Sequence, residues 1–86
     1  MSKMPLQTLN IELEQFIKLY KPYLIIVEKN KVNQVVSIVG WVEGETTNYP
    51  IQISVTKDFE KILENQRYTL VNVQYHGSQK ILIFKR

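Results

Sequence analysis

"VVSIVGWVEG", residues 35–44, is the stretch that decides the fold, because its run of valine and isoleucine predicts a β-strand. Near its middle stand Gly40 and Trp41, the only tryptophan of the chain. A glycine weakens a strand, so we predict a sharp bend of the chain at Gly40. Without a bulge, alternation places Trp41 on the face of Ser37 and Glu43, where a ligand or partner reaches it. A bulge at Gly40 would instead turn Trp41 into the core, and both arrangements stay open.

The patterns on either side predict four more strands and two helices. Residues 51–57 alternate between apolar and polar side chains, as a strand with one buried face does. Residues 10–21 carry apolar side chains at helical spacing and end at Pro22, which disfavours a helical conformation before it. The full prediction is a lead-in over 1–9, a helix over 10–21 capped by Asn10, strands over 23–29 and 34–44, a loop over 45–50, a strand over 51–57, a helix over 58–66 capped by Asp58, and strands over 67–77 and 79–86.

The composition indicates a small globular protein of one domain, residues 1–86. With 44% hydrophobic and 22% charged residues, the chain has enough apolar side chains to form a core. No cysteine is present, which excludes a disulfide framework and thiolate metal sites. The sequence shows neither a signal peptide nor a membrane-spanning run, so we expect a cytoplasmic protein.

Charge is unevenly distributed along the chain, whose net charge is +3. Residues 65–86 carry Arg67, Lys80, Lys85 and Arg86 and no acidic residue. This asymmetry predicts an anionic partner for that end, with a simple solvated basic tail as the alternative.

No pattern typical of catalysis appears. His76 is the only histidine and falls in a predicted hairpin turn, and Asp58 is explained as a helix cap. Glu43 and Glu45 are two residues apart but fit a solvated strand end, and three glycines cannot build a phosphate-binding loop. We therefore expect a protein that is not an enzyme and that holds neither a cofactor nor a metal.

The order of elements resembles the OB-fold family, in which five strands carry a short helix between the third and fourth. "VVSIVGWVEG" resembles the glycine-containing strand near the start of many OB domains, and "ILENQRYTLVNVQYHGSQKILIF" resembles their closing section. The resemblance covers residues 23–86 and implies a mainly β fold: a five-stranded OB-type Greek-key barrel with an added N-terminal helix. An SH3-like barrel is the alternative for a short all-β chain.

OB grooves combine aromatic stacking with a basic lining, so the candidate contact residues are aromatic or positively charged. They are Trp41, Tyr49 and Tyr75 for stacking or anchoring, and Lys31, Lys57, Lys80 and Lys85 for phosphates or an acidic partner surface.

The scale of the chain, its lack of cysteine and its Ile, Lys and Glu content are similar to those of the small OB-like accessory subunits of the crenarchaeal family-B DNA polymerase holoenzyme. This resemblance implies a non-catalytic adaptor in DNA replication or repair. Such an adaptor would bind a protein partner, with a DNA polymerase as one candidate, and would contact single-stranded nucleic acid weakly. The alternatives are a stand-alone single-stranded DNA or RNA binder and a viral or structural assembly module.

Overall fold

Five antiparallel strands form one sheet in the order β3-β2-β1-β5-β4. The computed structural model describes residues 12–46, 48–51 and 58–86. The strands are β1 (Leu24–Lys29), β2 (Val35–Trp41), β3 (Asn48–Pro50), β4 (Thr69–His76) and β5 (Gln79–Lys85). The mainly β fold expected from the sequence is therefore confirmed.

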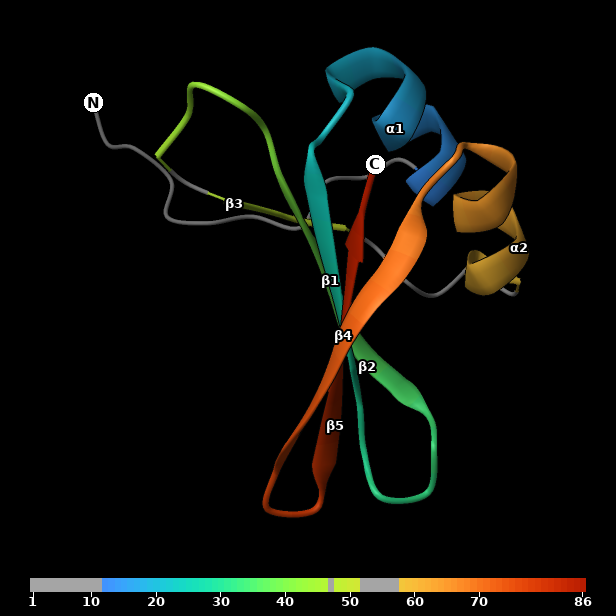
Figure 1. Cartoon of the computed structure of the whole chain (residues 1–86), viewed down its shortest axis with the longest axis vertical. Coiled ribbons are helices and arrows are strands. Elements are labelled where there is room, and N and C mark those ends of the chain that lie inside the picture. The colour runs from blue at the N-terminus through green and yellow to red at the C-terminus, as the bar shows by residue number, and fades with distance from the viewer. Residues whose placement is uncertain (1–11, 47, 52–57) are drawn as a thin grey trace.

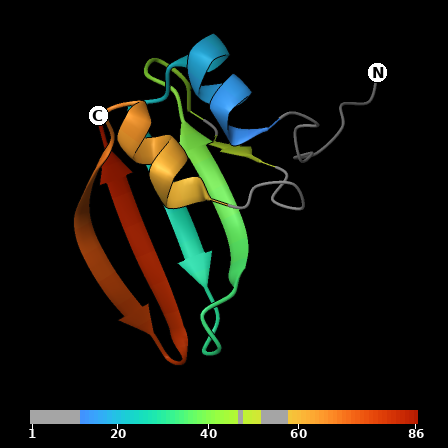
Figure 2. The same ribbon diagram turned by 90° about the vertical axis from the view of Figure 1, so that its right-hand side faces the viewer.

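Two short helices, α1 (Leu13–Tyr20) and α2 (Phe59–Asn65), lie side by side on one face of this sheet (Figures 1 and 2). They cover the half of the sheet that is remote from the β1–β2 and β4–β5 hairpin turns, which project beyond them (Figure 2). Within the described part of the chain, no helix has the length and apolar character needed to cross a membrane.

The core lies between the helices and the central strands. Alternation along β1 buries Ile25 and Val27 toward the helices, and their cross-strand partners on β5, Phe84 and Leu82, are buried beside them. The other buried apolar residues are Leu13, Phe16, Ile17, Ile38, Ile51, Phe59, Leu63 and Tyr68. Each short helix is thus held mainly by its apolar face rather than by its own length.

Gly40 gives Phe16 room to pack on the sheet. Gly40 pairs with Ile25 on β1 and with Tyr49 on β3, and the ladder keeps its register there, so β2 has no bulge at this position. A Cβ added to Gly40 would lie 2.4 Å from Cε2 of the buried Phe16 ring. This close approach, rather than the bend predicted from the sequence, explains the glycine.

Because the ladder is regular from Ser37 to Trp41, Trp41 lies on the same face as Ser37, opposite to the helices. Its side chain is partly exposed. Of the two arrangements that the sequence left open, the regular strand is the one observed.

Several predicted boundaries need correction. Strand β3 lies at Asn48–Pro50, inside the segment predicted as a loop, because its backbone pairs with β2. Of the strand predicted over 51–57, only Ile51 is described, and its N–H donates to the carbonyl of Ile38 at 2.8 Å. Helix α1 begins at Leu13, with Glu12 as its N-cap residue, whereas the predicted cap Asn10 lies outside the described residues.

Strands β3 and β4 are the two edges of the sheet that the described residues form. Closure into a barrel would require these edges to meet, and no such pairing is present among residues 12–46, 48–51 and 58–86. The OB-type Greek-key barrel therefore stays a prediction, while the antiparallel five-stranded sheet is established.

Helix α2 ends in a Schellman motif whose left-handed residue is Arg67, with φ 70°. The Tyr68 N–H donates to the Leu63 carbonyl at 2.8 Å, and the Arg67 N–H to the Glu64 carbonyl at 3.0 Å. Glycine occupies this conformation without the penalty of about 1–2 kcal/mol that a side chain brings. We expect Arg67→Gly to raise the free energy of unfolding, measured in urea, by about 0.5–1 kcal/mol. Arg67→Ala is the control, and a glycine variant no more stable than the alanine variant would contradict this expectation.

Candidate binding surfaces

The contact residues predicted from the sequence lie on several different surfaces of the structure. Tyr75 and Lys80 lie on the helix side of the sheet, and Trp41 and Lys85 lie on the opposite side. Lys31 is exposed in the β1–β2 turn, and Tyr49 lies on β3. Lys57 lies outside the described residues. The predicted residues therefore do not form a single groove.

The hairpin end of the sheet carries a row of three side chains, Lys29, Lys80 and Tyr75, which we call the basic row. Lys80 on β5 is the direct cross-strand partner of Lys29 on β1 and of Tyr75 on β4. Direct partners share a face of an antiparallel sheet. Lys29 was not among the predicted site residues, because its position beside Lys80 depends on the pairing of the first strand with the last.

Within the described ranges, no carboxylate forms an ion pair with Lys29 or Lys80. The ion pair found in the described part of the chain is Lys18–Glu14 on α1, with 3.4 Å between Nζ and Oε2. The Lys29 ammonium instead lies 5.3 Å from the centre of the Phe59 ring, a cation–π contact at the start of α2. Two like charges directly opposite each other destabilise a sheet, so this row favours a bound anion.

Strand β4 presents an uncharged edge. Its eight residues, TLVNVQYH, include no lysine, arginine, aspartate or glutamate, and all of them are exposed. A register shift between Leu70 and Asn72 leaves Val71 out of the ladder. Leu70, Val73 and Tyr75 then lie on the helix side, and Asn72 and Gln74 on the other side. An extended segment from another molecule can pair with such an edge.

Tyr49 belongs to an aromatic cluster with two residues of α1. Its ring centre lies 5.9 Å from that of Phe16 and 5.2 Å from that of Tyr20. Its hydroxyl donates to Oε1 of Glu45, and this hydrogen bond is the main cause that raises the pKa of Tyr49. The ring was expected in a loop, free for stacking, but it packs β3 against α1. We therefore assign it a structural contact.

The indole Nε1 of Trp41 is buried and has no hydrogen-bond partner among the described residues. Across the sheet its neighbours are Leu24 and then Lys85, on the side opposite to the helices. An apolar residue thus separates Trp41 from the predicted phosphate contact Lys85, so the two do not form a compact basic and aromatic site.

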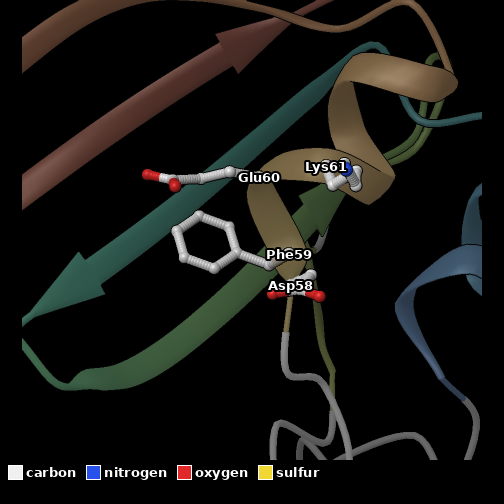
Figure 3. Close-up of a pocket in the computed structure, with 4 residues that line it drawn as sticks. All are labelled: Asp58, Phe59, Glu60 and Lys61. Atoms are coloured by element: carbon white, nitrogen blue, oxygen red, sulfur yellow. The ribbon is translucent and has the colours of Figure 1, made fainter.

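Two surface hollows lie on the described part of the chain, and the first adjoins the basic row through the contact of Lys29 with the Phe59 ring. One is lined by Asp58, Phe59, Glu60 and Lys61 at the start of α2, where the Phe59 ring points toward the strands and Glu60 extends beside it (Figure 3). The other is lined by Tyr23, Glu43 and Gly44. No three potential metal ligands come together within the described ranges.

Comparisons with protein-family models, with curated proteins and with solved structures find no match to this chain. Its function is therefore inferred from the chemistry of its own surfaces. Two of these surfaces have a distinctive chemistry: the uncharged, exposed edge of β4, and the basic row.

Proposed function

We propose that this protein is a non-catalytic adaptor that binds another protein by adding a strand of that protein to β4. The observation that carries the proposal is the edge itself. It is eight residues long, has no Lys, Arg, Asp or Glu, is exposed along its whole length and, among the described residues, pairs on one side only, with β5.

An edge strand leaves alternate backbone N–H and C=O groups without partners, and these groups attract other strands. Proteins usually protect such edges with lysine, proline or a strong twist. Strand β4 contains neither lysine nor proline, and the irregularity at Val71 is its only interruption. A partner strand would satisfy the free backbone groups and cover the exposed apolar side chains.

The side chains of β4 define the chemistry of the partner. Leu70, Val73 and Tyr75 are apolar and lie on one side, while Asn72 and Gln74 are polar and lie on the other. A matching segment is extended and alternates between apolar and polar residues, with its apolar side chains toward the helix side. The resemblance in element order to OB domains supports a partner in DNA replication or repair, with a DNA polymerase as the candidate.

The test is capture of partners from native extract, followed by recapture of the purified partner by two matched variants. Val73→Lys places a charge on the β4 edge, where Val73 is 38% exposed. Val36→Lys adds the same charge to β2, at a residue 44% exposed. We expect Val73→Lys to weaken partner binding at least about tenfold, because a lysine on an edge strand disfavours pairing with another strand. We expect Val36→Lys to leave partner binding unchanged.

Amide hydrogen exchange then locates the interface. The outward amides of β4 should exchange rapidly in the free protein and become protected in the complex. Recovery of the chain alone would overturn the adaptor and favour an assembly module. Protection of these amides in the free monomer would also overturn it, because the edge would then be closed within the chain, as in a barrel. Equal loss of binding in both variants would exclude β4 as the interface.

A further inference from the structure

We propose that the basic row, Lys29, Lys80 and Tyr75, is a binding site for single-stranded nucleic acid. The two lysines would contact phosphates, and the Tyr75 ring would stack on a base. This site shares Tyr75 with the β4 edge but differs from it in its two lysines, which lie on the helix side of β1 and β5.

The charges of the basic row favour a bound anion. Lys29 and Lys80 are directly opposite each other, an arrangement that costs stability unless an anion lies nearby. All eight acidic residues of the chain lie in the described ranges, and none of them forms an ion pair there with either lysine. Glu60 is the carboxylate that extends on the helix side from the start of α2 (Figure 3). Among the described residues, the two lysines therefore have no ion-pair partner of their own.

The aromatic neighbour of the two lysines favours a nucleic acid over other anions. Tyr75 is 69% exposed, an unusual position for a large ring, and it pairs directly with Lys80. Neighbouring strands are about 5 Å apart, so the row spans about 10 Å from Tyr75 to Lys29. An exposed ring next to lysines suits the alternation of bases and phosphates along a single strand. An inorganic anion would use the lysines and leave the ring without a role.

The position of the basic row in the fold leaves it accessible to a ligand. The row lies at the hairpin end of the sheet, where the strands project beyond α1 and α2 (Figure 2). Lys31 is exposed in the adjacent β1–β2 turn and extends the positive surface. Contact of Lys29 with the Phe59 ring limits the freedom of that lysine, which reduces the entropy lost on binding.

Fluorescence anisotropy with a short labelled oligothymidylate at low salt tests the site. Lys29→Ala, Lys80→Ala and Tyr75→Ala should each weaken binding about tenfold, and Tyr75→Phe should retain it. Each lysine variant should also reduce the salt dependence of log K by about 0.7. Glu60→Gln should tighten binding severalfold, because it removes a nearby negative charge. Circular dichroism confirms that each variant is folded.

Lys85→Ala is the matched control, because Lys85 lies on the same strand but on the opposite face of the sheet. It should change affinity less than twofold. The proposal is overturned if the oligonucleotide does not bind at low salt, or if Lys85→Ala weakens binding as much as Lys80→Ala does. Equal competition by pyrophosphate or by a polyglutamate peptide would also overturn it, showing a general anion site. Lys29→Ala should leave capture of the protein partner unchanged, which separates this site from the proposed function.

Discussion

Gly40→Ala is expected to lower the free energy of unfolding by about 1–3 kcal/mol, the usual effect of overpacking a core. The added Cβ would lie 2.4 Å from Cε2 and 2.8 Å from Cζ of Phe16. That ring is fully buried, and Tyr20 and Tyr49 pack on it. It therefore cannot move aside without disturbing the contact between α1 and the sheet. Elsewhere in a strand the same substitution would be neutral or favourable, because it removes the flexibility of glycine.

A double-mutant cycle tests whether contact with the Phe16 ring causes the loss of stability in Gly40→Ala. If Phe16 is the obstacle, Gly40→Ala should destabilise a Phe16→Leu background much less than it destabilises the natural protein, since leucine leaves space beside Gly40. Ser37→Ala, in the same strand but on the opposite face, is the control and should change stability by less than about 0.5 kcal/mol. Both effects are read from urea denaturation. A Gly40→Ala protein as stable as the natural one would contradict the close packing of Phe16.

The elements of this fold could be predicted from local patterns. The β-branched runs placed β1, β2 and β5 within a few residues of their observed bounds, because each strand has a regular alternation between a buried and a less buried face. Strand β3 lies in a segment predicted as a loop, whereas the strand predicted over 51–57 falls, apart from Ile51, outside the described residues. Asn48–Pro50 has little apolar alternation, and its pairing with β2 depends on the neighbouring strand rather than on its own sequence.

The candidate sites were only partly predictable, because they depend on register between distant strands. Tyr75 and Lys80 were selected from the sequence, and their pairing across a hairpin is local. Lys29 was missed, because only the pairing of β1 with β5 brings it beside Lys80. Tyr49 was selected as an exposed ring, yet its packing on α1 depends on a tertiary contact. Local sequence thus identified the residue types, and long-range pairing decided which of them share a surface.

Tyr68→Phe is expected to destabilise the fold by about 1–3 kcal/mol, the penalty for leaving a buried acceptor without its donor. The Tyr68 hydroxyl donates to the carbonyl of Pro22, and both residues are buried. The bond ties the start of β4 to the turn between α1 and β1. Tyr23→Phe is the matched control, because Tyr23 is 41% exposed, and it should change stability by less than about 0.5 kcal/mol.

The same hydroxyl should make stability depend on alkaline pH. Burial raises the pKa of Tyr68 above its ordinary value of 10.0, and nearby Arg86 partly opposes this shift. Since the folded state favours the neutral phenol, the stabilisation is complete below pH 10 and is lost as the pH rises through the raised pKa. The difference in unfolding free energy between the natural protein and Tyr68→Phe should therefore shrink above pH 10 in urea titrations. A difference that stays constant or grows there would show that the hydroxyl is not buried against Pro22.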